Sequence, residues 1–490
     1  MKKKLVLLWE ILIIHLAVHY LVISKLLARK WRKRLLAKIA TEAKLRGQIK
    51  TPLLLLSSMN NKRLTDIKKI NNLNFCQAIL SHNFSKPKIS IDAVNNSHSI
   101  LLVVHNSAPY DNAGYALRTL HEAKAYQALG YQVTIVTRLG YPWDLAKHRE
   151  LPFQTSRWVD GIEILAIGGT RQYKIDSDLK YAVQYGQKVA EIISERNIGL
   201  IQASSNYING FAAYFASRKT GVPYIYEARG MWHVTAASAN PTFRQSERFN
   251  YEDRMEQLVL NHASANIFIS DILKKRYYQN KEIPALIIKN CINDLSENAI
   301  IHKNYQKENP FKLVYVGSLV YYEGLVSLID VVAGLENKNI QLDIYGSGPH
   351  QAAVERKLAQ VKALNVFFHG RVPSEQVAGI YRNAHGVVVP RVDCEVTQMV
   401  PPLKPIEAIW HGLPVIVSEL PAIVELMQGL NALLYAKPDD ASSLKKQILS
   451  LRDDYQRYVS YVPSDIEYIR NHRSWNKEMA QITELITTKS

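Results

Sequence analysis

The chain has 490 residues, too many for one ordinary hydrophobic core, which predicts two domains of about 150–200 residues with additional segments. Hydrophobic residues make up 47% of the chain and charged residues 21%, which excludes a wholly disordered or collagen-like protein. Its three cysteines, Cys76, Cys291 and Cys394, are too few and too widely spaced for a disulfide framework or a zinc site. We interpret them as reduced thiols.

Most of the net charge of +18 lies in residues 1–98, which hold 14 Lys and 5 Arg against four acidic residues. This basic segment is either a solvated run of charges or a segment that binds anionic lipid. A neighbouring apolar stretch favours binding to lipid. A nucleic-acid-binding protein would still bind nucleic acid after deletion of residues 1–98, and this binding would depend steeply on salt. The nearly neutral remainder argues against such a protein, so no nucleic-acid partner is expected.

An apolar stretch over residues 5–24, LVLLWEILIIHLAVHYLVIS, is about long enough to cross a bilayer core. Glu10 and the two histidines do not share one helical face, which favours a span over a surface helix. The larger basic cluster follows the stretch, and the positive-inside rule then places the main body in the cytoplasm. We expect a membrane anchor over 1–30, a basic juxtamembrane segment and linker over 31–98, and membrane lipid as a partner.

A parallel α/β domain is predicted over residues 99–305. A strand begins at Ser99, a helix runs from about Tyr115 to Leu129, and the next strand starts after Gly130, an order that implies a parallel sheet. Further strands are predicted in GIEILAI, IGLIQASS, PYIYEAR, ANIFIS and ALIIKN.

A second α/β series follows a break near Pro310 and spans residues 306–465. Its predicted strands are KLVYVGS, QLDIYGSG, NVFFHG, GVVVPR, LPVIVSE and NALLYA, with helices between them. Two doubly wound halves place their ligand loops at the carboxyl ends of the strands, facing an interdomain cleft. Residues 466–490 are predicted to form a helix with the option of crossing back to the first half.

Glycines after strands are candidate ligand positions. Gly114 precedes the first helix, Gly317 and Ser318 follow a second-half strand, and Gly346 follows the next strand. A glycine lets a ligand approach the backbone, and free amides at a helix start favour anions. A plain turn is the alternative for each. The GSG at 346–348 does not fit the GxGxxG fingerprint, so a dinucleotide is not expected.

The segment PRVDCEVTQMVPPLKPIEAIWHG carries the densest set of candidate ligands. A strand ends at Arg391, and a helix starting near Pro405 places Glu407 in its first turn, with Lys404 just before it. A carboxylate there accepts two ribose hydroxyls, and the two cations with the helix amides hold a diphosphate. The alternative is a capping glutamate beside two solvated cations.

In the first half, Glu227 and Arg229 follow an apolar strand at the predicted cleft edge. A charged pair there orients acceptor hydroxyls or assists a departing phosphate. A structural ion pair is the alternative.

The second half resembles the nucleotide-binding domain of family 4 glycosyltransferases in YVGSLVYYEGL, LDIYGSGP, FHGRVPSEQVAGIYRNAHGVVVPR and PLKPIEAIWHGLPVIVSE. The first half is similar in NAGYALRT, ALGYQVTIVT and YEARGMW, the last of which resembles a motif of bacterial polysaccharide-assembly members. The resemblance covers about residues 99–485. It implies a GT-B fold, with two Rossmann-like domains facing a cleft.

The resemblance also implies an activity: retaining transfer of a sugar from a nucleotide-sugar to a glycan or lipid-linked acceptor, without a metal or other cofactor. The expected place of action is the cytoplasmic side of the membrane, in the synthesis of a cell-surface polysaccharide. Within this resemblance, Glu407 matches the ribose ligand.

Two departures from the family pattern affect the site. The family usually has Arg and Lys contacting the donor phosphates at positions that are Ser318 and Glu323 here. Arg391 and Lys404 are therefore expected to bind the phosphates instead. The family also usually has a second glutamate where this chain has Met399, and Asp393 or Glu395 in the same loop is the candidate replacement.

Two other functions stay open at this point, one of an enzyme and one of a non-catalytic protein. A metal-dependent GT-A glycosyltransferase would use Asp176-Ser-Asp178, although these acids suit a helix cap. A non-catalytic membrane-bound subunit would keep the fold and lose the acid, and Met399 and Glu323 are its best evidence.

Overall fold

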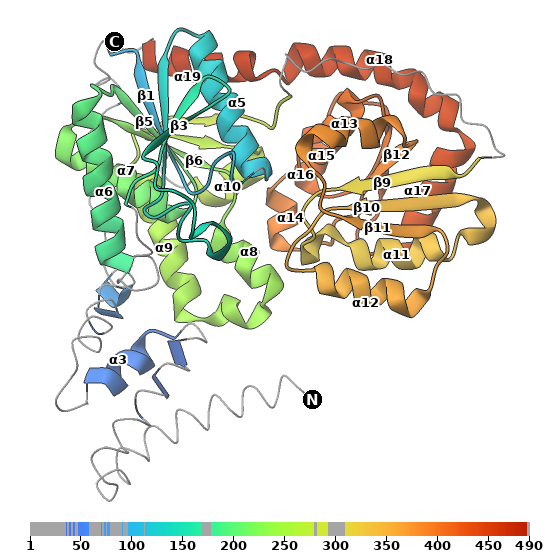
Figure 1. The fold of residues 1–490 in the computed structure, drawn as a ribbon, viewed down its shortest axis with the longest axis horizontal. Coiled ribbons are helices and arrows are strands. Elements are labelled where there is room, and N and C mark those ends of the chain that lie inside the picture. Colours follow the sequence, from blue (N-terminus) through green and yellow to red (C-terminus); the bar gives the residue numbers. More distant parts are fainter. Residues whose placement is uncertain are drawn as a thin grey trace, which may run out of the picture.

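The computed structural model describes residues 97–111, 113–168, 178–278, 282–292 and 309–487, together with separate positions between Leu36 and Ile91. The expected membrane anchor lies outside these residues. Within the described part, no helix is both long enough and apolar enough for a transmembrane span. Two α/β domains lie side by side (Figure 1).

The first domain is built on an eight-stranded sheet with the strand order β3-β4-β2-β1-β5-β6-β7-β8. All neighbours are parallel except β3, which runs antiparallel to β4 at the edge. The strands are β1 (Ser99–Val104), β2 (Gln132–Thr137), β3 (Ser156–Val159), β4 (Ile162–Leu165), β5 (Leu200–Ser204), β6 (Tyr224–Ala228), β7 (Ala265–Phe268) and β8 (Ala285–Ile287).

Strand β1 shows why this sheet is central. Every one of its residues is buried, and alternate side chains enter two different hydrophobic clusters. Leu101 and Val103 pack with helices α6 and α7, whereas Ile100 and Leu102 pack with α5. Because side chains alternate across a strand, a continuous apolar run places a strand between two helical layers.

Three helices of the first domain, α7, α9 and α10, begin at side-chain caps. The side chains of Asn206, Ser246 and Ser270 each accept a hydrogen bond from an amide in the first turn of the next helix. The helices are α5 (Gly114–Ala128), α6 (Asp178–Glu195), α7 (Tyr207–Thr220), α8 (Trp232–Ala239), α9 (Glu247–His262) and α10 (Asp271–Tyr277).

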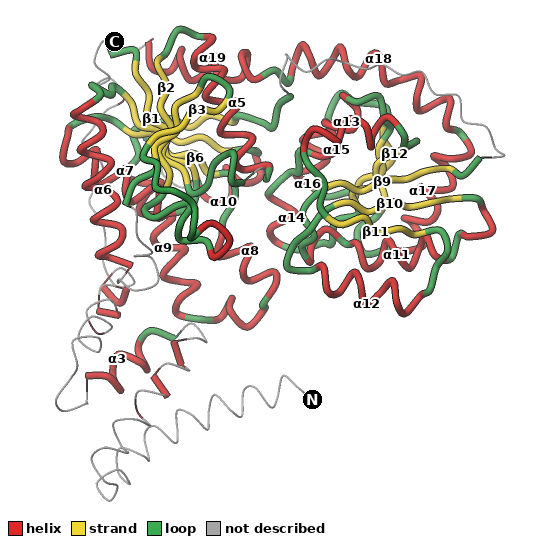
Figure 2. Tube along the Cα trace, viewed as in Figure 1, coloured by secondary structure: helices red, strands yellow, loops and turns green. Residues whose placement is uncertain are grey.

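The second domain has a six-stranded, fully parallel sheet in the order β11-β10-β9-β12-β13-β14 (Figure 2). The strand order reverses between β9 and β12, where ligand loops of doubly wound sheets gather. The strands are β9 (Phe311–Val316), β10 (Ile340–Tyr345), β11 (Val366–Gly370), β12 (Gly386–Val389), β13 (Val415–Ser418) and β14 (Leu433–Ala436). The helices are α11 (Leu325–Ala333), α12 (Gln351–Val361), α13 (Ser374–Arg382), α14 (Glu395–Met399), α15 (Lys404–Trp410), α16 (Pro421–Met427) and α17 (Ala441–Asp453).

The C-terminal helices connect the domains. Helix α18 (Tyr455–His472) lies on the second domain, and α19 (Trp475–Thr487) lies on the first (Figure 1). Trp475 and Met479 share a hydrophobic cluster with Leu120 of α5. Ile292, at the end of the first domain, pairs with Ser474 in an isolated β-bridge. The end of the first domain therefore pairs with the residue between α18 and α19, where the chain returns to the first domain.

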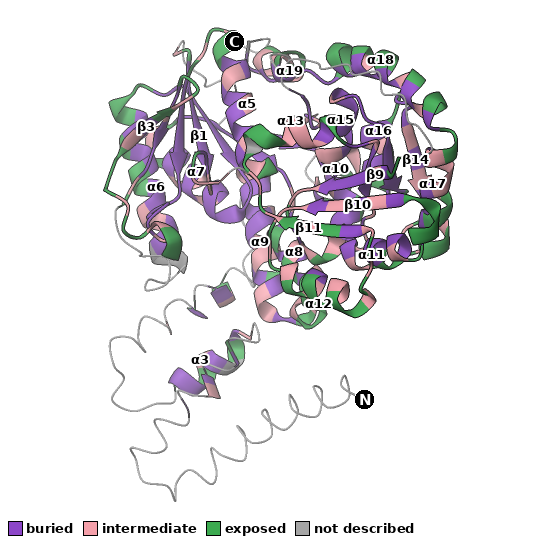
Figure 3. Ribbon diagram, turned by 45° about the vertical axis from the view of Figure 1, so that its right-hand side comes forward, coloured by how far each residue is buried: buried purple, intermediate pink, exposed green. Residues whose placement is uncertain are grey.

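The described part of the N-terminal segment packs on the first domain. Helix α3 (Lys50–Ser57) begins where the Glu247 carboxylate accepts hydrogen bonds from the amides of Ile49 and Lys50, at 2.5 and 2.7 Å. Leu55 and Leu56 belong to a core cluster of the first domain, and Figure 3 colours part of α3 as buried. The sequence predicted a linker with one short helix here, and Leu55 and Leu56 of TPLLLL bury apolar area against the core.

Candidate active site between the two domains

Residues 400–403 of the second domain lie against two glycines of the first domain. A Cβ atom on Gly114 would stand 3.3 Å from Leu403 Cδ1, and one on Gly230 would stand 3.3 Å from Val400 Cγ2. Gly114 and Gly230 follow β1 and β6, and residues 400–403 follow β12. The loops at the carboxyl ends of both sheets therefore meet, as expected for ligand sites of doubly wound folds.

Two hydrogen bonds hold the same loop of the second domain. Ser270 Oγ donates to the Met399 carbonyl at 2.6 Å, and Asn290 Nδ2 donates to the Pro401 carbonyl at 3.0 Å. Both side chains follow strands of the first sheet. The approach of the two domains is thus specified by directional polar contacts as well as by packing.

One buried carboxylate collects the two cations that were expected to bind phosphate. Glu323 is only 2% exposed, and its Oε2 lies 2.9 Å from Lys404 Nζ. Its Oε1 accepts from Arg391 Nη2 at 2.7 Å and from Arg391 Nε at 3.0 Å. The Tyr315 hydroxyl donates to Glu323 Oε2, at 3.1 Å. The three charged groups leave one positive charge in surplus.

The glycines predicted in this region are sterically required. A Cβ atom on Gly317, whose φ is +152°, would stand 2.3 Å from Lys404 Cε, so the lysine stem lies on this backbone. A Cβ atom on Gly346, whose φ is +146°, would stand 1.8 Å from the Gly317 carbonyl oxygen. Ser318 is exposed beside them. The structure therefore brings Gly317, Ser318, Gly346 and Lys404 together.

Glu407 lies in the first turn of α15 and is partly buried. Burial raises the pKa of its carboxyl group, and the nearby Lys404 ammonium lowers that pKa. No described residue donates a hydrogen bond to this carboxylate. A partly buried acceptor without a protein donor favours binding of a ligand hydroxyl.

Glu227 and Arg229 belong to a buried network of four charges with Arg118 and Glu122. Arg229 donates to Glu227 at 2.8 Å and to Glu122 at 2.5 Å. Arg118 Nε lies 2.8 Å from both carboxylates. Each of the four residues is at most 8% exposed. This geometry matches the structural ion pair that the sequence left open, and contact of Glu227 or Arg229 with substrate stays a prediction.

Burial and the neighbouring charges shift the pKa values of the two carboxyl groups in opposite directions. Burial raises the pKa of Glu122 to about 8. Burial also acts to raise the pKa of Glu227, but Arg229 and Arg118 outweigh it and hold that pKa well below its usual range. Sequence reasoning missed Arg118 and Glu122, although their i,i+4 spacing on α5 was a usable signal.

Glu395, the candidate replacement acid, forms a salt bridge across the domain boundary. Its carboxylate lies 2.5 Å from Arg244 Nη1 and 3.7 Å from Arg276 Nη2, both of the first domain. Met399 is buried in the same short helix. The side chain of Asp393, the other candidate, accepts from Gln398 at 2.8 Å. A catalytic role for Glu395 stays a prediction.

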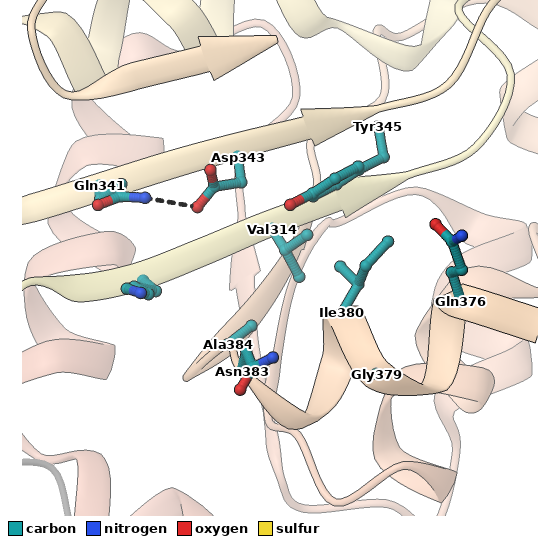
Figure 4. Close-up of a pocket in the computed structure, with 10 residues that line it drawn as sticks. Val314, Gln341, Asp343, Tyr345, Gln376, Gly379, Ile380, Asn383 and Ala384 are labelled. Atoms are coloured by element: carbon teal, nitrogen blue, oxygen red, sulfur yellow. Dashed lines mark hydrogen bonds between the residues drawn. The ribbon is translucent and has the colours of Figure 1, made fainter. Parts of the chain in front are cut away.

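A pocket of about 400 Å³ flanks the glycine loops on the sheet face beside α13 (Figure 4). Tyr345 stacks on His369 with the ring centroids 4.4 Å apart, and Asp343 accepts from His369 Nε2 at 2.7 Å. Alternate residues of β10 are only partly buried. The remaining residues that line the pocket are Lys312, Val314, Gln341, Gln376, Gly379, Ile380, Asn383 and Ala384.

We found no metal-binding cluster of His, Cys, Asp or Glu within the described residues. Asp176 of the alternative Asp-Ser-Asp site lies outside them, and Asp178 begins α6.

Replacing Glu323 with Gln is expected to lower the free energy of unfolding by about 3 kcal/mol near neutral pH, because two buried cations lose their counter-charge. Burial acts to raise the pKa of Glu323, but Arg391 and Lys404 outweigh it and hold that pKa at about 2. A lowered folded-state pKa stabilises the protein above the unfolded pKa of about 4.5, and this contribution is lost as the pH falls toward 2.

Urea unfolding across acidic and neutral pH measures this difference. The exposed Glu419→Gln variant serves as the control. A difference between wild type and Glu323→Gln that stays constant down to pH 3 would contradict the assignment.

Comparison with known families decides the classification. Residues 113–286 match the model described as "Glycosyl transferase 4-like domain", and residues 310–454 match "Glycosyl transferases group 1". Together the two matches cover more than half of the chain. The chain belongs to the group 1 glycosyltransferases.

Two curated relatives of this glycosyltransferase are bacterial enzymes. The chain is 25% identical over 232 residues to the O-antigen chain mannosyltransferase RfbU of Salmonella typhimurium, covering 45% of this chain and 60% of the relative. It is 27% identical over 159 residues to the D-rhamnosyltransferase WbpZ of Pseudomonas aeruginosa, covering 32% of this chain and 40% of the relative. The matches thus span less than two thirds of either relative.

Solved structures show the fold. Sucrose-phosphate synthase from Thermosynechococcus elongatus superposes with a TM-score of 0.64 at 16% identity, covering 80% of this chain and 98% of that one. Anabaena Alr3699/HepE in complex with UDP and glucose superposes with a TM-score of 0.59 at 15% identity, covering 80% and 99%. The two parallel α/β domains of this glycosyltransferase form a GT-B fold.

Proposed function

We propose that this glycosyltransferase moves a sugar from a nucleotide-sugar to a glycan or lipid-linked acceptor, with retention of configuration, during synthesis of a cell-surface polysaccharide. Family membership supports the transfer chemistry. The names of the relatives, an O-antigen chain mannosyltransferase and a D-rhamnosyltransferase, support a polysaccharide product. The structure of Anabaena HepE with UDP and glucose supports a nucleotide-sugar donor.

The donor binds to the second domain. Glu407 accepts hydrogen bonds from the ribose hydroxyls, because its carboxylate has no donor among the described residues. The diphosphate lies over Gly317 and takes the surplus positive charge of the cluster formed by Lys404, Arg391 and Glu323. Positive charge that faces a leaving diphosphate lowers the barrier to transfer. The unpartnered carboxylate beside this cationic cluster is the observation that carries the proposal.

The acceptor approaches from the first domain. Its hydroxyl comes from the side of Gly114, which already touches the loop of the second domain. Contact between the two domains keeps water from the donor, and water would otherwise hydrolyse it. Glu395 supplies the second acidic group, at the boundary where it now pairs with Arg244. No metal or other cofactor takes part in this scheme.

We place the enzyme at the cytoplasmic side of a membrane, held by its N-terminus. The basic and apolar residues before Ser99 support this placement. Anionic lipid is the expected partner of this segment.

A second candidate function is that of a non-catalytic subunit with a degenerate glycosyltransferase fold. Two observations favour it: Met399 is buried where the family usually has an acid, and Glu323 neutralises one of the two available cations. Such a subunit would show neither transfer nor hydrolysis of any donor.

A ligand screen on the full chain in detergent tests the donor site. We expect one of the UDP-, GDP-, ADP- or CMP-sugars to raise the melting temperature without added metal, because a ligand that binds the folded state stabilises it. Glu407→Ala is expected to lose this shift, whereas Glu467→Ala, which removes an exposed glutamate of α18, keeps it. An undiminished shift in Glu407→Ala would exclude the ribose role, and no shift with any donor would favour the non-catalytic subunit.

A further inference from the structure

The side chain of Arg157, in edge strand β3, is buried without a counter-charge. It is 8% exposed, and its Nε, Nη1 and Nη2 atoms are all buried with no acceptor in the described structure. An unpaired buried guanidinium is unfavourable, and buried polar groups in folded proteins are nearly always hydrogen-bonded. An exception that involves all three nitrogens of one side chain requires an explanation.

The ring of Tyr110 packs against this guanidinium. Arg157 Cζ lies 4.4 Å from the centre of the Tyr110 ring. That ring also contacts Tyr141, with centroids 6.3 Å apart, and His148, with centroids 4.9 Å apart. His148 Nε2 is likewise buried without a hydrogen-bond partner among the described residues. The Tyr110 ring therefore contacts two side chains whose buried nitrogens lack partners in this part of the chain.

The carboxylates on the neighbouring loops are already used. Asp144 lies 2.6 Å from Arg138 Nη2 and balances that guanidinium. Asp111 accepts hydrogen bonds from Asn106 Nδ2 at 2.8 Å and from the Ala113 amide at 3.0 Å. The positive charge of Arg157 is thus not compensated by either group.

The position of Arg157 is close to the carboxyl edge of the first sheet. It pairs with Ile164, one residue before the end of β4. Tyr110 belongs to the loop between β1 and α5, which leads to Gly114. Arg157 is therefore on the domain that receives the acceptor and not on the domain that carries Glu407.

We propose that Arg157, packed against Tyr110, binds an oxyanion of the acceptor: a phosphate group or the carboxylate of an acidic sugar. A guanidinium presents a planar fork of donors that matches either group with two parallel hydrogen bonds. This inference rests on the proposed function for the identity of the ligand, because it makes the anion part of the acceptor. The site itself depends only on the first domain.

The test uses the full chain in detergent with Lys404→Met as the parent, so that anion binding near Gly317 is weakened. Inorganic pyrophosphate and sodium glucuronate are titrated separately, and the melting temperature is recorded. We expect one of the two anions to raise the melting temperature of the parent. Arg157→Met is expected to weaken the apparent affinity ~10-fold or more, because a hydrogen bond to a charged group contributes that much. Arg149→Met, which removes an exposed charge nearby, keeps the affinity.

The two anions distinguish the two possible kinds of acceptor. A shift with pyrophosphate alone identifies a phosphorylated acceptor, and a shift with glucuronate alone identifies an acidic sugar. Without ligand, Arg157→Met is expected to melt at or above the temperature of the parent, since an unpaired buried charge has been removed. Should that variant fail to fold, Arg157→Lys keeps the charge but not the fork and is expected to weaken binding as well.

Two outcomes overturn the proposal: no shift with either anion, or equal shifts in the parent and in the folded Arg157 variants. The donor screen is independent of both, because Glu407 lies in the other domain. An Arg157-dependent anion shift without any nucleotide-sugar shift would leave this site standing and remove the proposed function.

Discussion

Replacing Lys404 with Met is expected to slow sugar transfer about 100- to 1000-fold, the loss found when one donor to a developing oxyanion is removed. The substitution removes the surplus positive charge of the cluster, because Glu323 and Arg391 then neutralise each other. Binding of the donor is expected to weaken as well. The fold should persist, since Glu323 Oε1 keeps both hydrogen bonds from Arg391.

Transfer by purified full-length variants measures this effect. Lys446→Met on α17 removes a lysine far from the site in sequence and structure, and it should retain full activity. Full transfer by Lys404→Met with an unchanged KM for the donor would show that the surplus charge does not contact the diphosphate.

Replacing Arg229 with Met is expected to lower the free energy of unfolding by about 3–5 kcal/mol, the usual cost of removing one partner from a buried ion pair. Glu122 and Glu227 would then share only Arg118. Glu122→Gln alone should cost less than Arg229→Met, because burial raises the pKa of Glu122 and Glu227 still balances one of the two guanidinium groups.

A double-mutant cycle separates support from catalysis. If the network supports the first sheet, Arg229→Met combined with Glu122→Gln recovers part of the lost stability, and transfer falls in step with the folded fraction. Denaturant unfolding and the kcat of the folded protein are measured on the same samples. A loss of kcat at unchanged stability would instead return Arg229 to the catalytic role that the sequence suggested.

The strands could be predicted because burial alone specifies them. Strands β12 and β13 of the second sheet are continuous apolar runs, as burial on both faces requires, whereas burial alternates along β10 and β11. The position of Glu407 in a first helical turn followed from Pro405 in the same way. The edge strand β3 was missed, because Arg157 and an exposed Trp158 interrupt the apolar pattern there.

By itself, then, the sequence determined the class of fold and the positions of most strands along the chain, and it predicted the loop glycines and Glu407 as ligand positions. These features depend on residues close together in the chain. Only the tertiary structure decided which charges meet. Lys404 and Arg391 are 81 and 68 residues from Glu323, and a carboxylate that neutralises a distant cation leaves no local pattern. The lone guanidinium of Arg157 is equally invisible in sequence, because whether a charge is buried and unpaired depends on every element packed around it.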